Sequence, residues 1–122
     1  MRVRAARGAI VVAADTADDV LASTEHLLRQ MIGRNAVATD DLVSILFTAT
    51  EDLRAAFPAE AARRMGLGSV PLMCACEIPV SGSKPSVVRV LMHFHSDLSL
   101  GEVTHVYLEG AESLRDDLDA VG

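Results

Sequence analysis

The sequence predicts a single α+β domain, residues 1–122, in which a five-stranded mixed sheet packs against one long helix and one short helix. Three observations lead to this prediction. Five short segments are rich in β-branched and apolar residues, one longer segment has helical periodicity, and 122 residues suffice for one domain with a core. Because half of the residues are apolar and the mean hydropathy is +0.29, we expect a folded chain that also buries surface against copies of itself.

The first two predicted elements are a strand over residues 3–12 and a helix over residues 17–33. The strand segment is rich in β-branched and small residues. Asp15 and Thr16 are suited to cap the helix, and apolar residues then recur at spacings of three, four and seven. Gly33 is predicted to end this helix.

The remaining elements are short strands and one more helix. Proline early and glycine late favour a short helix from Phe57 and Pro58 to Gly66. The other segments of high strand propensity cover residues 42–49, 70–76, 86–95 and 103–108.

One face of the predicted sheet lacks a cover. Five strands about 4.8 Å apart span roughly 20–25 Å, whereas one helix with its side chains covers about 10–12 Å. Residues 42–49 and 86–95 are nevertheless apolar on both faces. Subunit association is the simplest source of the missing cover.

Charge and hydropathy exclude several kinds of partner. The formal charge of −6 has the wrong sign for a protein that neutralises phosphates, so we expect neither nucleic acid nor an anionic membrane as a partner. The apolar run that starts at Ala9 stops before Asp15 after six residues, too short for an export signal, and no segment is long enough to span a membrane. We therefore expect a cytoplasmic protein with Cys74 and Cys76 as free thiols.

Four polar residues on the predicted strands are candidates for chemistry. Arg7 and Arg89 lie within apolar strand segments, where a guanidinium costs several kcal/mol of desolvation unless an anion meets it. Each is either half of a structural ion pair or a ligand-binding group, and the sequence supports both explanations equally. Tyr107 needs a hydrogen-bond partner if it is buried, while an acid at a strand end, such as Glu77, is usually only solvated.

A metal or cofactor site is not expected. The pairs Cys74-x-Cys76 and His93-x-His95 each place like residues on one strand face, but zinc sites favour two or more residues between paired cysteines. The sequence has no glycine-rich phosphate loop and no nucleophile elbow. The histidines have no predicted partner for triad chemistry.

Short motifs in a fixed order resemble the monofunctional chorismate mutases of the trimeric α/β class. The resemblance extends over nearly the whole chain and depends on the order and spacing of the motifs together. They are Arg7-Gly8-Ala9, Asp15-Thr16, Ala49-Thr50-Glu51-Asp52-Leu53, Phe57-Pro58-Ala59, Val70-Pro71-Leu72 leading to Cys74 and Glu77, Val88-Arg89-Val90, His105-Val106-Tyr107-Leu108-Glu109 and Leu114-Arg115.

The resemblance implies a homotrimeric pseudo-α/β-barrel with active sites between neighbouring subunits. It also implies a reaction, the pericyclic conversion of the dianion chorismate to prephenate in aromatic amino-acid biosynthesis. That rearrangement needs no nucleophile, metal or nucleotide, so catalysis would come from conformational restraint and from charge stabilisation at the transition state.

The resemblance further implies a role for each site residue. Arg89 would stabilise the breaking ether oxygen, Arg7 and Tyr107 would hold a carboxylate, and Glu77 with the backbone near Cys74 would bind the ring hydroxyl. The remaining predicted substrate-binding residues, which shape the wall or close the site, are Phe57, Ala59, Arg63, Leu72, Met73, Leu114 and Arg115.

Several details qualify this assignment. Glu60 and Met73 stand where the family has a familiar lysine and threonine, and Asp116 replaces a familiar proline. Cys74 and Glu77 have opposite strand parity, so a bend near Pro79 is needed if both are to face one ligand. Residues 109–122 are predicted to form a mobile tail that orders over the substrate.

The sequence leaves two alternative functions open. One is a trimer similar to the enamine/imine deaminases, which also hold a carboxylate with an arginine at a subunit interface. It leaves Glu77 and Tyr107 without a role. The other is a trimeric module that binds an aromatic-pathway metabolite without converting it, for which the same arginines suffice.

Overall fold

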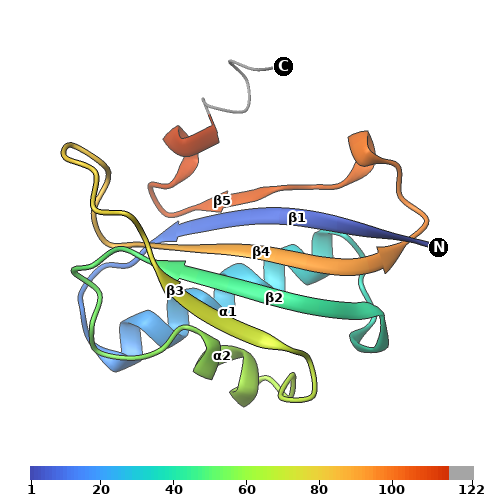
Figure 1. The fold of residues 1–122 in the computed structure, drawn as a ribbon, viewed down its shortest axis with the longest axis horizontal. Helices are drawn as coiled ribbons and strands as arrows, with labels where there is room; N and C mark the ends of the chain where they lie inside the picture. Colours follow the sequence, from blue (N-terminus) through green and yellow to red (C-terminus); the bar gives the residue numbers. More distant parts are fainter. Residues whose placement is uncertain (116–122) are drawn as a thin grey trace.

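The computed structural model of the protein describes residues 1–115. Its central feature is a five-stranded sheet (Figure 1). The elements in chain order are β1 (Arg2–Val11), α1 (Ala17–Arg34), η1 (Thr39–Asp41), β2 (Leu42–Ala49), α2 (Ala59–Arg64), β3 (Leu72–Cys76), β4 (Val87–Ser96), η2 (Leu100–Glu102), β5 (Val106–Leu108) and η3 (Glu112–Arg115).

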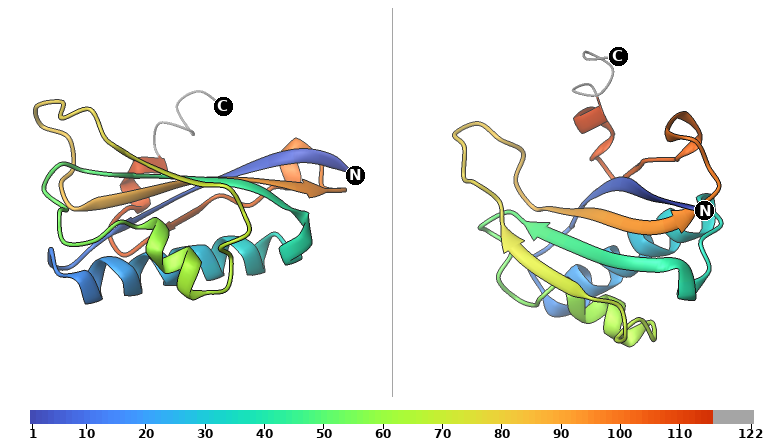
Figure 2. Two further views of the ribbon diagram at one scale, coloured as in Figure 1. Left: turned by 60° about the horizontal axis from the view of Figure 1, so that its bottom comes forward. Right: turned by 45° about the vertical axis from the view of Figure 1, so that its right-hand side comes forward.

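The strands lie in the order β3-β2-β4-β1-β5. The central strand β4 is antiparallel to both β1 and β2, while β3 is parallel to β2 and β5 is parallel to β1. Both helices pack against the same face of this sheet (Figure 2). The predicted mixed sheet with one long and one short helix is therefore confirmed.

The hydrophobic core lies between the sheet and the helices. Alternate residues of β4, including Met92 and Phe94, point to this side and are fully buried, together with Leu27, Leu28 and Met31 of α1. Helix and sheet approach so closely that a Cβ built on Gly8 would lie 2.5 Å from the Met31 sulfur. A larger residue at this position of β1 would require the Met31 side chain to move.

The long helix begins as predicted and ends one residue later than predicted. Thr16 is the N-cap, and its hydroxyl accepts a hydrogen bond from the Asp19 amide at 3.1 Å. Gly33 lies within the helix, and Asn35 is the C-cap. The side-chain amide nitrogen of Asn35 donates to the carbonyls of Met31 and Thr104, and its side-chain oxygen accepts from the Thr104 backbone amide. A contact distant in sequence therefore fixes the helix end.

Two strands are shorter than predicted. The prediction of a strand from residue 70 fails because β3 starts at Leu72, after Pro71, whose carbonyl accepts from Ile45 but which has no amide proton to donate. The prediction of a strand from residue 103 fails because β5 starts only at Val106. The Thr104 backbone bonds to Asn35 rather than to the sheet.

One β-bulge interrupts the pairing of β2 with β4. Leu42 pairs with Phe94 and Ser44 pairs with the adjacent His93, so Val43 is an extra residue. The bulge lets Leu42 pack against the core while Ser44, Leu46 and Thr48 alternate on the opposite face.

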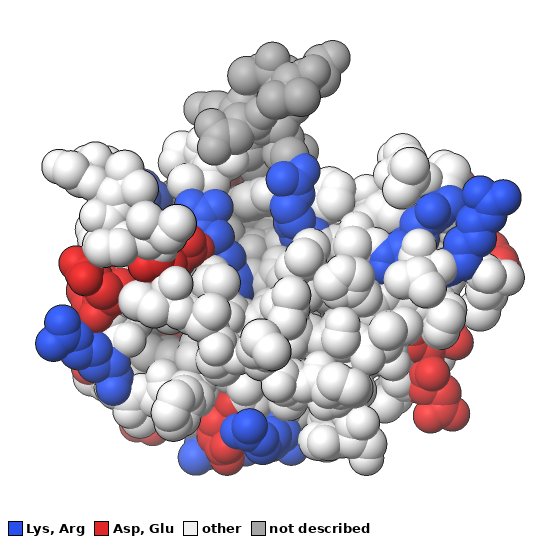
Figure 3. Space-filling model, in the orientation of Figure 1, with Lys and Arg blue, Asp and Glu red and all other residues white. Residues whose placement is uncertain are grey.

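The face of the sheet opposite α1 and α2, called the bare face below, has no α-helical layer within the described residues, and only the segment around η3 packs on part of it. Val3, Leu46 and Met73 on this face are exposed. Figure 3 shows that its centre is uncharged, while charged side chains lie around its margin. The predicted lack of a cover over an apolar second face is therefore confirmed within one chain.

Candidate active site

The candidate site lies on the bare face, where strand register aligns residues of the neighbouring strands. Thr48 of β2 is the register partner of Arg89 on β4, and Arg89 is in turn the partner of Ala9 on β1. Ala9 pairs with Tyr107 on the edge strand β5. The small side chain of Ala9 lies between the two large polar ones, and Arg7, two residues earlier, points to the same face.

These side chains line one open cavity of about 340 Å³. Its wall combines the polar groups with aliphatic surface. The lining residues are Arg7, Gly8, Leu46, Thr48, Glu77, Arg89, Val90, Leu91 and Tyr107. The fold therefore brings together four predicted site residues that lie on four different parts of the chain.

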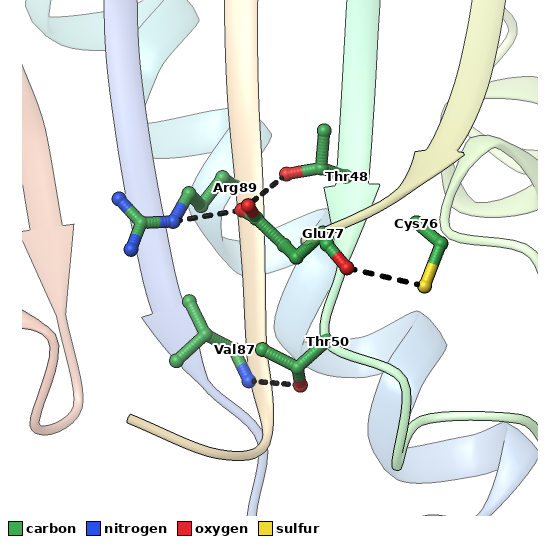
Figure 4. A network of polar contacts seen from close by, with 6 residues as sticks. All are labelled: Thr48, Thr50, Cys76, Glu77, Val87 and Arg89. Carbon is green, nitrogen blue, oxygen red and sulfur yellow. Dashed lines mark hydrogen bonds and ion pairs between the residues drawn. The ribbon is translucent and has the colours of Figure 1, made fainter. Parts of the chain in front are cut away.

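Arg89 forms an ion pair with Glu77 on the cavity wall. The Arg89 Nε lies 2.8 Å from Glu77 Oε1, and the two side chains are 45% and 27% exposed. Figure 4 shows the terminal guanidinium nitrogens on the side away from Glu77, over β1. Both explanations that the sequence left open thus apply in part, because Arg89 is ion-paired through Nε and also faces a cavity. The pair is not locked in the interior, so its terminal nitrogens stay accessible to an anion.

Glu77 comes directly after β3. Its amide donates to the Ala49 carbonyl at 2.9 Å, which continues the ladder for one residue. Its Oε1 accepts a hydrogen bond from the Thr48 hydroxyl at 2.7 Å in addition to the Arg89 contact. The carboxylate is therefore held by two neighbouring strands at once.

Cys74 and Glu77 do not face one cavity within a single chain, so the expectation of a bend that unites them is wrong at this level. Cys74 packs against the core side, whereas Glu77 has the parity of Met73 and points to the bare face. Cys74 instead lines a separate apolar cavity of about 490 Å³ with Phe57, whose side chain is 74% exposed.

The other predicted wall residues are spread over β3, α2 and η3. Ala59 is buried in α2, Leu72 packs against the core and Met73 is exposed on the bare face. Arg63 is exposed and its Nη1 lies 3.1 Å from the carboxylate of Glu60, the residue at the familiar lysine position. One chain alone therefore does not gather these side chains around the Arg89 cavity.

Residues 109–115, the first half of the predicted mobile tail, fold back onto the sheet. Ala111 is fully buried beside Ala9 and Val87, and Leu114 packs against the same cluster next to Tyr107. Arg115 is the last residue of η3. The remainder of the predicted tail, including Asp116, lies outside the described residues.

Sequence reasoning missed Thr48, which belongs to the cavity. The sequence contained one signal, a hydroxyl at the same strand parity as the exposed Leu46 in an otherwise apolar segment. Only the register of β2 against β4 reveals that this hydroxyl lies opposite Arg89.

Within residues 1–115 no group of three or more histidine, cysteine and acidic side chains is arranged to hold a metal ion. No helix in the described part of the chain combines the length and apolarity needed to cross a membrane.

Fold and cavity together define an α+β protein whose sheet presents a cationic, partly apolar site suited to a small anion. The chorismate mutase type I family matches residues 3–118, and the chain belongs to this family. It is therefore a chorismate mutase, an isomerase.

Individual relatives support the same assignment. The chain is 46% identical to chorismate mutase AroH of Thermus thermophilus over 119 residues, which covers 97% of this chain and 98% of the relative. It is 40% identical to chorismate mutase AroH of Bacillus subtilis over 119 residues, covering 97% and 94%. A solved chorismate mutase from Clostridium thermocellum superposes with a TM-score of 0.89 at 48% identity, covering 90% of this chain and 98% of that one.

Proposed function

We propose that the protein converts chorismate to prephenate in the cavity lined by Arg7, Glu77, Arg89 and Tyr107. The observation that supports this proposal most directly is the convergence of two arginines and a phenol on one partly apolar cavity, in a chain of the chorismate mutase family. Chorismate has two carboxylates, and the cavity keeps a net positive charge that attracts such an anion, because only one of its two guanidinium groups is paired with Glu77.

The proposed reaction is intramolecular. As the ether C–O bond breaks and the new C–C bond forms, negative charge gathers on the ether oxygen, and no proton or covalent intermediate is needed. The cavity therefore contributes by holding the folded conformer of the substrate and by stabilising this transient charge.

Arg89 is the proposed source of that stabilisation. Its Nε is fixed by Glu77, and its terminal nitrogens have no other hydrogen bond among the described residues, so they can donate to the ether oxygen without first breaking a contact. A donor oriented before the reaction costs little reorganisation in the transition state.

The neighbouring groups would hold the rest of the substrate. Arg7 and the Tyr107 hydroxyl would bind a carboxylate, since both line the cavity beside Arg89. The second oxygen of Glu77 would accept from the ring hydroxyl. We further propose that Arg115 closes over the bound substrate.

The protein is proposed to act as a homotrimer. The uncharged centre of the bare face, with Leu46 and Met73 exposed, supports burial against other copies of the chain. A neighbouring subunit would then supply the wall residues that one chain leaves apart from the Arg89 cavity, namely Phe57, Ala59, Arg63, Leu72, Met73 and Cys74.

The decisive experiment follows the loss of chorismate in purified protein without added metal or nucleotide. We expect saturable turnover and a single product of unchanged mass, because the reaction is an isomerisation. Saturable binding of chorismate without turnover would reject the enzyme and favour a metabolite-binding module. Release of ammonia from an enamine substrate would favour a deaminase.

A further inference from the structure

The Thr48 hydroxyl donates to the same carboxylate oxygen that receives the Arg89 guanidinium. Thr48 Oγ1 lies 2.7 Å from Glu77 Oε1, and Arg89 Nε lies 2.8 Å from the same atom. Figure 4 shows both contacts meeting at one oxygen. Within residues 1–115, no hydrogen bond is made to Glu77 Oε2.

This geometry differs from the usual arrangement of an arginine with a carboxylate. Such pairs frequently form two parallel hydrogen bonds, which occupy both carboxylate oxygens and one terminal nitrogen. Here the ion-pair contact joins Nε to one oxygen, Oε1, and no two-bond arrangement is formed; this arrangement is called the single-bond form below. Rotation of the Glu77 carboxylate toward the two-bond arrangement would weaken the bond from Thr48, so the hydroxyl opposes that rotation.

We propose that Thr48 is a positioning residue that keeps the Arg89–Glu77 pair in its single-bond form. Through this bond it leaves the terminal nitrogens of Arg89 and Oε2 of Glu77 available to a ligand. The inference rests on the proposed function for its kinetic consequence, while the geometry of the pair can be tested without turnover.

The register of the sheet makes this role specific to Thr48. Thr48 is the direct partner of Arg89 across β2 and β4, and Glu77 follows β3 on the other side of β2. Thr48 therefore lies on the strand between the two charged residues. Ser44 offers a matched comparison, because its hydroxyl contacts His93 across the same two strands at 3.2 Å but outside the cavity.

The kinetic test compares Thr48→Val, which removes the hydroxyl at nearly constant shape, with Thr48→Ser, which keeps it. We expect Thr48→Val to lower kcat roughly tenfold and to change KM less than about threefold, because a hydrogen bond to a charged group is lost and the pair rearranges. Thr48→Ser should restore kcat to within about twofold, and Ser44→Ala should leave kcat and KM within about twofold.

A double-mutant cycle separates positioning from packing. In a Glu77→Ala background, Thr48→Val should have no further effect on kcat, because the hydroxyl acts only through the carboxylate. Wild-type kinetics in Thr48→Val would overturn the inference, as would equal losses in Thr48→Val and Thr48→Ser or an undiminished effect in the Glu77→Ala background.

A crystal structure of Thr48→Val tests the geometry independently of activity. Two hydrogen bonds between Arg89 and Glu77 would support the proposed role, and an unchanged contact between Nε and Oε1, as in the parent protein, would overturn it. If the parent protein does not convert chorismate, the proposed function fails while this structural comparison still decides the role of Thr48.

Discussion

The two faces of the sheet are built from alternate residues of the same strands, yet they differ in what their side chains do. On the helix-covered face of β4, Val88, Val90, Met92 and Phe94 are all buried in the core. On the bare face of the same strand, Arg89 and His95 are exposed and Leu91 and His93 are half-buried. One face therefore forms the core and the other carries the proposed site, and a substitution should affect mainly stability or mainly activity according to its strand parity.

The largest expected effect is on the covered face. Phe94 is fully buried, so Phe94→Ala should lower the free energy of unfolding by about 3–5 kcal/mol through lost burial and a residual cavity. Urea unfolding at one protein concentration measures this free energy. Leu100→Ala, at a side chain that is 76% exposed, is the control and should change it by less than about 0.5 kcal/mol. Equal effects of both variants would contradict the division between the faces.

The next effect is on the bare face and concerns rate rather than stability. Arg89→Ala should lower kcat at least ~10²–10³-fold, the cost of losing one preorganised donor at developing charge, while the fold and subunit assembly remain intact. Steady-state turnover of chorismate, circular dichroism and size-exclusion chromatography measure the three properties.

Arg4→Ala is the matched control for Arg89→Ala. Arg4 also lies on a central strand, and its Nε donates to the Leu98 carbonyl at 2.7 Å, but it does not line the cavity. Its kcat should stay within about twofold of the parent value. Near-normal turnover by Arg89→Ala would reject the proposed mechanism.

The smallest expected effect concerns Asp52, which lies in the loop after β2. Its carboxylate accepts hydrogen bonds from Ser86, the residue before β4. Hydrogen bonds from Thr50 and then Ser86 hold the Asp52 pKa below its usual value of 3.8, with desolvation partly opposing them. A carboxyl whose pKa is lowered on folding stabilises the protein above its unfolded pKa, and this contribution disappears as the pH falls through the folded pKa.

Asp52→Asn should therefore be slightly less stable than the parent at neutral pH and should approach the parent as the pH falls below 3.8. Urea unfolding across this range measures the difference. A difference in the free energy of unfolding between the two proteins that grows as the pH falls would contradict the predicted sign.

The sequence predicted the fold well because its patterns are local. Helical spacing placed α1 to within one residue, and strand propensity placed β2 at its observed ends. The errors at Gly33 and at the start of β5 share one cause, the contact between Asn35 and Thr104, which are 69 residues apart in sequence. Periodicity within a segment contains no information about such a contact.

The candidate site was predictable in part for a similar reason. Arg7 and Arg89 were conspicuous because a charge within an apolar strand is costly, and the family resemblance supplied Glu77 and Tyr107. The ion pair between Arg89 and Glu77, and the place of Thr48 beside it, depend on how β3, β2 and β4 align. Register is set by the assembled sheet, so one strand read alone does not give it.

The bulge at Val43 has a consequence for changes in chain length. Because Val43 is an extra residue, losing it would leave Leu42 toward the core and Ser44 toward the opposite face, with all later residues of β2 in place. A one-residue deletion between Ser44 and Thr48 would instead invert the orientation of one end of the strand. The start of β2 therefore tolerates an indel that the segment leading to the active-site hydroxyl does not.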